Sequence, residues 1–262
     1  MSQIRQPAVA GMFYPADAQI LKADIHQYLQ QVETVSGDVP KAIVVPHAGY
    51  VYSGPIAASA YKQILPFKDK ITRVVLLGPS HQVAFHGLAV PQSDFFNTPL
   101  GNIPIDHKGI GLLAGLPQVI TSDQAHLQEH SLEVQLPFLQ EVLSEFTLIP
   151  IVVGDAERNE VAEVINRFLD DEHTLIVIST DLSHYHNYNE AKQLDSATSD
   201  AIVNLKADLI EYEDACGRNG LKGMLTVAEE KHLTVDLLDL RNSGDTSGDK
   251  SRVVGYGAYV IH

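Results

Sequence analysis

Cysteine, tryptophan and long apolar runs are scarce in this chain. Its 262 residues include one cysteine, Cys216, and no tryptophan. A single cysteine excludes an intrachain disulfide and is typical of a reducing compartment. The chain has no apolar run of about 18 residues, and its N-terminus lacks the apolar stretch of a signal peptide. We therefore expect a cytoplasmic protein with no membrane-spanning segment.

Positive charge is also scarce. Lysine and arginine together number 18 against 33 aspartates and glutamates, which gives a net charge of -15. Nucleic acid and anionic membrane surfaces would repel such a chain, so we expect neither as a partner.

Several sequence motifs of common enzyme classes are absent. There is no G-x-x-x-x-G-K-[ST] phosphate loop, no G-x-G-x-x-G dinucleotide fingerprint and no G-x-S-x-G nucleophile elbow. These absences argue against nucleotide hydrolysis, dinucleotide redox chemistry and serine hydrolysis.

Apolar β-branched runs alternate with helical periodicity along the whole chain. This alternation predicts an α/β protein, a three-layer α/β/α sandwich with a mixed, mostly parallel central sheet, formed as one domain over residues 1–262. We expect strands at 41–45, 72–77, 87–90, 147–153, 174–180, 235–240 and 253–261, and a hairpin within 91–106. We expect helices at 16–35, 55–65, 107–115, 131–146 (kinked or shifted by Pro137), 157–169, 187–206, 207–216 and 217–231.

Histidines and one aspartate end three of these predicted strands. His47 follows the first strand, His81 the second, and Asp181 with His184 the fifth. In an open α/β sheet, ligands bind beyond the carboxyl ends of the strands. Imidazole binds zinc, iron, copper and nickel, so the pattern predicts one shared polar site. The alternatives are loop histidines satisfied by hydrogen bonds, and Asp181 as a helix N-cap.

Three further segments carry polar candidates. Glu129 and His130 could orient the metal-binding histidines from outside the ligand set, or could serve only to stabilise a helix. The segment 242–251 is rich in Gly, Ser and Asp and offers Asp245, Thr246 and Asp249 to a ligand, or is a polar turn. Cys216 is interpreted as a small buried residue of a helix, far in sequence from the histidine motifs.

Six motifs resemble, in the same order, those of the Memo-like family, also called AmmeMemoRadiSam system protein B. They are AGMFYP, VPHAGYVYSG, LGPSH, EHSLEVQLPFL, STDLSHY and NSGD…VVGYGAY, and they extend from about Pro7 to the C-terminus. The family is similar in fold to class III extradiol dioxygenases, which hold non-haem iron(II) with two histidines and a carboxylate. The resemblance therefore implies an α/β/α sandwich with its site at the strand ends.

The resemblance also implies roles for individual residues. The family's first two metal ligands match His47 and His81, and its pocket Asp and His match Asp181 and His184. The third ligand of the animal Memo protein is a cysteine, whose matching position here is Thr246, a poor ligand for a soft metal. Asp245 or Asp249 could restore a two-His-one-carboxylate set.

Two classes of function follow from these observations. One is a metal-dependent oxidoreductase of dioxygenase type, holding iron(II) or, as alternatives, zinc or copper, with His184 as the acid–base residue and Asp181 orienting it. Zinc in the same set would instead suit hydrolysis. The other is a non-catalytic component that binds a small-molecule or peptide ligand and works with the AMMECR-type and radical SAM proteins that the family name records. Spare edge strands are compatible with a homo-oligomer.

Overall fold

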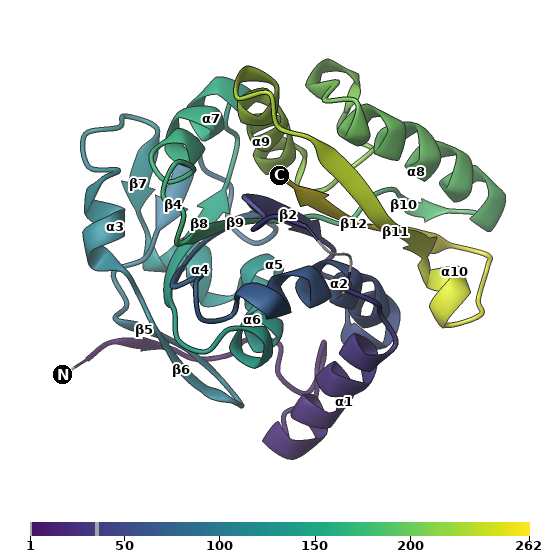
Figure 1. Cartoon of the computed structure of the whole chain (residues 1–262), viewed down its shortest axis with the longest axis horizontal. Coiled ribbons are helices and arrows are strands. Elements are labelled where there is room, and N and C mark those ends of the chain that lie inside the picture. Colours follow the sequence, from purple (N-terminus) through teal and green to yellow (C-terminus); the bar gives the residue numbers. More distant parts are fainter. Residues whose placement is uncertain (1, 35–36) are drawn as a thin grey trace.

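The computed structural model describes residues 2–34 and 37–262 and contains a nine-stranded sheet with helices on both faces (Figure 1). Its strands are β2 (Ala42–Val45), β3 (Arg73–Pro79), β4 (Leu88–Val90), β7 (Val119–Thr121), β8 (Thr147–Val153), β9 (Thr174–Ser179), β10 (His184–His186), β11 (Val235–Asn242) and β12 (Val253–Ile261). The order is β10-β12-β2-β9-β3-β8-β4-β7, and β11 pairs with β12 outside this path.

The four central strands are parallel. β2 pairs with β9, β9 with β3, and β3 with β8, all in the same direction, whereas β12 runs antiparallel to β2 and β4 antiparallel to β8. The sheet is therefore mixed, as predicted. Because β2, β9 and β3 are parallel neighbours, their carboxyl ends lie at one edge of the sheet, where the histidine motifs follow.

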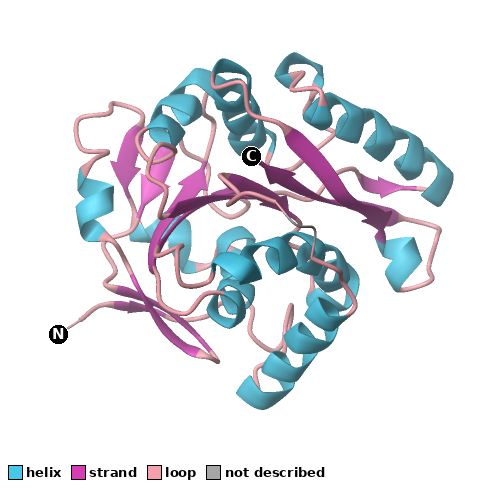
Figure 2. Ribbon diagram, viewed as in Figure 1, coloured by secondary structure: helices cyan, strands magenta, loops and turns pink. Residues whose placement is uncertain are grey.

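Alternate residues of each central strand face two separate apolar layers. On β2, Ile43 and Val45 join one buried cluster, whereas Ala42 and Val44 join the other. Figure 2 shows helices covering both faces of the sheet. One layer contains α1 (Ala18–Gln30), α2 (Tyr50–Ile64), α5 (His130–Glu133) and α6 (Leu136–Val142); the other contains α7 (Arg158–Asn166), α8 (Tyr188–Val203) and α9 (Arg218–Glu230). The predicted three-layer sandwich is confirmed.

A second, small sheet lies beside the main one. It joins β1 (Ile4–Arg5) to the hairpin of β5 (Phe95–Thr98) and β6 (Gly101–Pro104), which confirms the hairpin expected within 91–106. The remaining short helices are α3 (His107–Gly111), α4 (Asp123–Leu127), α10 (Ser243–Thr246), η1 (Leu65–Phe67) and η2 (Ala207–Leu209).

Proline shifts two of the predicted helices. The helix expected from Pro55 begins earlier, at Tyr50, so that Pro55 lies in its second turn. The helix expected over 131–146 is interrupted, and Pro137 lies in the first turn of α6. Backbone N–H groups in the first turn form no intrahelical hydrogen bond, so a proline there costs the helix none. The expected end of the first helix, at residue 35, lies outside the described residues.

The helix predicted over 207–216 is wrong. Only the 3₁₀ turn η2 forms there, and the chain then runs through turns to α9. The Asp214 carboxylate accepts a hydrogen bond of 2.7 Å from the backbone N–H of Glu211, a local bond that competes with helix formation. This irregular path decides where Cys216 lies.

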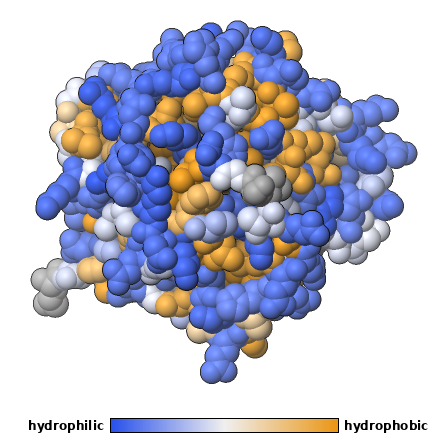
Figure 3. All heavy atoms as spheres, in the orientation of Figure 1, coloured by the Kyte–Doolittle hydropathy of each residue, from blue (hydrophilic) through white to orange (hydrophobic). Residues whose placement is uncertain are grey.

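On the face seen in Figure 3, hydrophilic residues predominate around the periphery and hydrophobic residues gather toward the middle. Across the described ranges, no helix combines the length and apolar character needed to cross a bilayer.

Candidate metal centre

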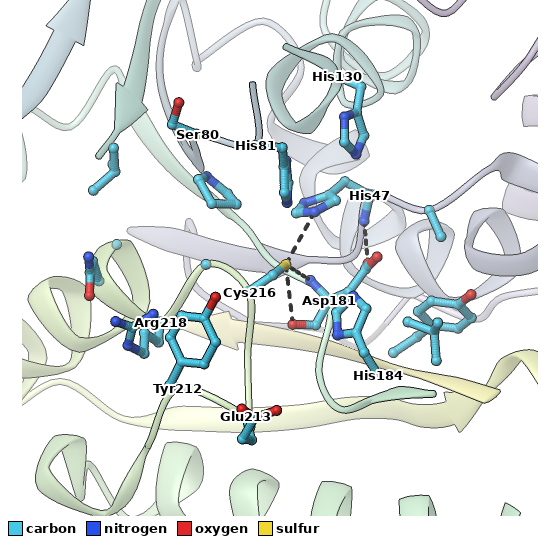
Figure 4. Close-up of a pocket in the computed structure, with 18 of the residues that line it drawn as sticks. His47, Ser80, His81, His130, Asp181, His184, Tyr212, Glu213, Cys216 and Arg218 are labelled. Atoms are coloured by element: carbon cyan, nitrogen blue, oxygen red, sulfur yellow. Dashed lines mark hydrogen bonds between the residues drawn. The ribbon is translucent and has the colours of Figure 1, made fainter. Parts of the chain in front are cut away.

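A cleft of about 1340 Å³ opens at the carboxyl ends of β2, β3 and β9. His47, His81, Asp181 and His184 all line it, so the structure brings together the four residues expected at the strand ends. Figure 4 shows the rings of His47 and His81 and the sulfur of Cys216 turned toward one another. The convergence follows from the parallel pairing of the three strands.

His47 is 2% exposed, and its protonation is fixed by its neighbours. Its Nδ1 lies 2.9 Å from the Ser179 hydroxyl oxygen. That hydroxyl donates its hydrogen to the Ser131 carbonyl and also accepts from the Gln135 amide, so it can only accept from Nδ1. The proton therefore sits on Nδ1, and the lone pair of Nε2 faces the cleft. Burial, together with the charges of neighbouring histidines, lowers the pKa of His47 well below its usual value, which favours the neutral ligand form.

His81 is fixed in the same tautomer by a carboxylate. Both its backbone N–H (2.6 Å) and its ring Nδ1 (2.8 Å) donate to Glu129. An ionised carboxylate only accepts, so the neutral His81 imidazole carries its proton on Nδ1 and keeps a free lone pair on Nε2. Burial alone would raise the pKa of Glu129, but the hydrogen bonds from His81, the positive charge of His81 when it is protonated, and the N–H of Ser131 outweigh it and lower the pKa to about 2. Glu129 thus orients His81, the role expected of it, as a carboxylate partner does for many metal-binding histidines.

Cys216 completes the cluster. Its Sγ lies 3.3 Å from Nε2 of His47, and the ligand atoms of His47, His81 and Cys216 all lie within 4.8 Å of one another. The interpretation of Cys216 as a helical residue remote from the histidines is wrong: it is half-buried, precedes α9 and lines the cleft. The one sequence signal near it was the glycine that follows, Gly217, since a Cβ there would come within 2.6 Å of the Ser179 carbonyl at the end of β9.

The thiol of Cys216 is held in its protonated form. Burial and the nearby charge of Asp181 raise its pKa to about 12. A protonated thiol can donate to the Nε2 lone pair of His47, in agreement with the tautomer derived above. Metal binding would replace that proton, as it does at other thiolate sites.

The segment after β11 does not reach the two histidines. Asp245 accepts hydrogen bonds from the Tyr188 hydroxyl (2.6 Å) and the Asn242 N–H (3.0 Å), and so caps the short helix α10. Thr246 donates to a backbone carbonyl within that helix and is not among the residues that line the cleft. Asp249 lines the cleft, but within the described ranges neither aspartate joins a group of close ligand atoms. The structure thus places Cys216, and not residues 245–249, beside the histidines.

His130 extends the imidazole cluster. Its ring stacks on His81 with centroids 4.6 Å apart and meets His47 edge-on at 5.5 Å. Burial and the charge of His81 lower the pKa of His130. His81, Glu129 and His130 form a second group of ligand atoms within 4.8 Å, but both Glu129 oxygens are already engaged by His81.

Asp181 and His184 lie on the opposite side of His47. Asp181 is buried and accepts a 2.7 Å hydrogen bond from the His47 backbone N–H. Burial raises its pKa, and the hydrogen bond from His47 only partly opposes this rise. His184, on β10, is half-buried and borders the cleft. The arrangement offers an imidazole that can exchange a proton with a bound molecule, and a carboxylate that fixes the loop after β2.

Comparison with known proteins identifies the family of the chain. The family model described as Memo-like protein matches residues 5–260. A MEMO1 family protein of Aquifex aeolicus is 40% identical over 270 residues, covering 97% of each chain. One from Methanococcoides burtonii is 38% identical and covers 98% of this chain and all of its own. With a match over nearly its whole length, this chain belongs to the Memo-like family.

Proposed function

We propose that this protein binds one divalent metal ion, iron(II) in the first place, through Nε2 of His47, Nε2 of His81 and Sγ of Cys216, and acts as a metal-dependent oxidoreductase. The observation that carries the proposal is the fixed tautomer of both imidazoles. Each directs its Nδ1 to an acceptor within the protein, which leaves the Nε2 lone pair for a metal; Nε2 of His47 lies beside the thiol, and a ligand atom of His81 lies within 4.8 Å of it.

The donor atoms fit a metal ion. In a tetrahedral site with ordinary metal–nitrogen and metal–sulfur bonds, the nitrogen and sulfur ligands lie about 3.6 Å apart. Nε2 of His47 and Sγ of Cys216 are 3.3 Å apart, close to that value. A set of three protein ligands leaves coordination positions open for substrate.

Iron(II) held by this set would supply one-electron redox chemistry at its open positions. The thiol is the observation that favours a second candidate, zinc, because thiolate is a preferred zinc ligand and zinc would direct the site toward hydrolysis.

The remaining roles belong to residues on the far side of the cleft. We assign His184 to proton exchange with the bound substrate, since its imidazole borders the cleft and an imidazole can both donate and accept a proton. Asp181 holds the His47 loop through the backbone N–H of His47 and so positions the ligand ring.

Metal content tests the proposal directly. Protein purified anaerobically would be loaded with iron(II) and, separately, with zinc, then desalted and measured by mass spectrometry. We expect one ion per chain in the wild type and little in His47→Ala, His81→Ala or Cys216→Ser. His86→Ala is the matched control, since His86 lines the same cleft but belongs to neither ligand group. Circular dichroism would establish that each variant is folded.

Two outcomes would overturn the proposal. If Cys216→Ser retained metal but Asp245→Asn or Asp249→Asn lost it, the third ligand would come from the segment after β11 and not from Cys216. A wild type that takes up neither metal would favour the alternative, a non-catalytic component that binds a small-molecule or peptide ligand in this cleft, working with AMMECR-type and radical SAM partners.

A further inference from the structure

Two arginines of the cleft lack the acidic partner that the other arginines have. The chain contains seven arginines. Five form ion pairs: Arg5 with Glu133, Arg73 with Asp106 and Asp171, Arg158 with Asp208, Arg167 with Glu163, and Arg241 with Asp239. The other two, Arg218 and Arg252, both line the cleft, and neither forms an ion pair with any described residue.

Each of these arginines lies over a tyrosine. The guanidinium carbon of Arg218 is 4.5 Å from the centroid of the Tyr212 ring, and that of Arg252 is 5.0 Å from the Tyr185 ring. Stacking occupies the flat face of a guanidinium and leaves its N–H edges available. Those edges are the groups that bind a carboxylate or a phosphate through two parallel hydrogen bonds.

The tyrosines of the cleft are unusually exposed. Tyr185 is 63% and Tyr212 69% exposed, and both line the cleft, as does the half-exposed Tyr52. Exposed aromatic rings around one concave site provide apolar area for a ligand at low entropic cost. Figure 4 shows Tyr212 beside Arg218, across the cleft from His130.

Backbone features position one member of each arginine–tyrosine pair. Arg218 is the first residue of α9, directly after Gly217, which packs against the end of β9. Tyr185 has a left-handed backbone with φ 64°, at a register shift of the β10–β12 ladder between His184 and His186. Such irregularities redirect a side chain at functional sites.

We propose that the cleft binds an organic anion, a small molecule whose carboxylate or phosphate is held by Arg218 and Arg252 and whose apolar body lies against Tyr185 and Tyr212. The orientation of its reacting end toward Cys216, two residues before Arg218, rests on the proposed function; recognition of the anion does not. At about 1340 Å³ the cleft has room for a molecule much larger than an inorganic ion.

Acidic residues in the cleft favour the alternative to an anionic ligand. Glu213, Asp155 and Asp249 also line it, and a neutral or cationic ligand would exploit them. Asp249 accepts two hydrogen bonds from Ser251, and Asp155 lies 3.6 Å from the imidazole of His86. These two carboxylates already have hydrogen-bond or ion-pair partners, whereas neither guanidinium group has an acidic partner among the described residues.

Calorimetric titration of metal-free protein with benzoate, phenyl phosphate and neutral benzamide tests this inference. We expect at least one anion to bind about tenfold more tightly than benzamide, with Arg218→Gln and Arg252→Gln each weakening it about tenfold and the double variant abolishing it. The preferred anion identifies the carboxylate or the phosphate as the recognised group. Arg158→Gln, which changes a surface arginine outside the cleft, is the control and should bind as the wild type does.

Equal binding of benzoate, phenyl phosphate and benzamide would overturn the inference, as would unchanged anion binding in the double variant. Metal content measured on the same samples separates this inference from the proposed function. Cys216→Ser should lose metal and keep anion affinity, whereas the arginine variants should keep metal and lose anion affinity. Failure of only one pattern identifies which of the two ideas is wrong.

Discussion

The two walls of the cleft are built in opposite ways. The histidine wall consists of His47, His81 and residues 129–135; most of its polar groups are buried and hydrogen-bonded to one another, and His81 lies at its exposed edge. The arginine wall consists of Tyr185, Tyr212, Arg218 and Arg252, whose aromatic rings are exposed and whose guanidinium groups have no acidic partner among the described residues. The protein's own hydrogen bonds fix the side chains of the first wall, whereas the guanidinium N–H groups of the second wall are available to a ligand.

This difference matches what each wall would have to do. A metal site needs ligand atoms held in fixed directions before the ion arrives, which buried hydrogen bonds provide. A substrate site needs groups that pair with the substrate and not with the protein. We therefore expect changes behind the histidine wall to affect stability and metal affinity, and changes in the arginine wall to affect ligand affinity alone.

The largest expected effect lies within the histidine wall, at Glu133. Its carboxylate pairs with the buried Arg5, accepts from the Tyr14 hydroxyl at 2.6 Å and receives two backbone N–H groups. Glu133→Gln leaves a buried guanidinium without its counter-charge, so we expect the free energy of unfolding to fall by about 3–5 kcal/mol in urea denaturation. Glu163→Gln, which breaks only the exposed pair with Arg167, should change it by less than about 1 kcal/mol. A similar fall in the free energy of unfolding for Glu133→Gln and Glu163→Gln would contradict the expected difference between the buried and the exposed ion pair.

Behind the arginine wall, Asp195 gives stability a distinct pH dependence. It accepts a 3.0 Å hydrogen bond from the Ser183 N–H, and burial raises its pKa from 3.8 to about 6. A raised carboxyl pKa means that its contribution to stability is fully present below about pH 3.8 and is lost as the pH rises through about 6. Asp195→Asn should remove this loss and raise the free energy of unfolding at pH 8 by up to about 3 kcal/mol.

Urea unfolding between pH 4 and pH 8 would measure the effect of Asp195→Asn. Asp200→Asn, an exposed change on the same helix, is the matched control and should keep the wild-type profile. A profile for Asp195→Asn that falls as steeply as that of the wild type would show that the carboxyl ionises in the folded protein as readily as in the unfolded chain.

A smaller effect is expected from Glu129→Gln, because the variant keeps an oxygen that can accept from His81 but loses the charge. Metal affinity, measured by competition with a chromophoric chelator, should fall about 10- to 100-fold, the usual consequence of removing the carboxylate behind a metal-binding histidine. The control is Glu190→Gln, which changes the exposed partner of His186. Unchanged affinity in Glu129→Gln would mean that His81 does not need its carboxylate partner to bind metal.

The two histidines of the histidine wall could be predicted from the sequence because their placement depends on strands alone. Residues 42–45 and 74–77 are uninterrupted apolar runs, so the strand ends, and hence His47 and His81, are well defined. Parallel pairing then brings the strand ends together. The same reasoning placed Asp181 and His184.

Cys216 could not be placed in this way. Its position depends on turns after η2 and on the close approach of Gly217 to the end of β9, which are tertiary features with no periodic signal. Resemblance alone pointed to Thr246, which lies within α10 and does not line the cleft. The arginine wall was missed for a related reason, since unpaired arginines are visible only when every ion pair is known.

The smallest expected effect on stability is also the sharpest test of the contrast between the walls. Tyr212 is 69% exposed, so Tyr212→Ala should change the free energy of unfolding by less than about 0.5 kcal/mol. The same change removes the ring beneath Arg218, and the affinity for the preferred anion should fall several-fold in calorimetry. Tyr212→Phe keeps the ring and should retain both properties. If Tyr212→Ala instead destabilised the fold and left anion affinity intact, the ring would be part of the framework, and the arginine wall would be no more open to a ligand than the histidine wall.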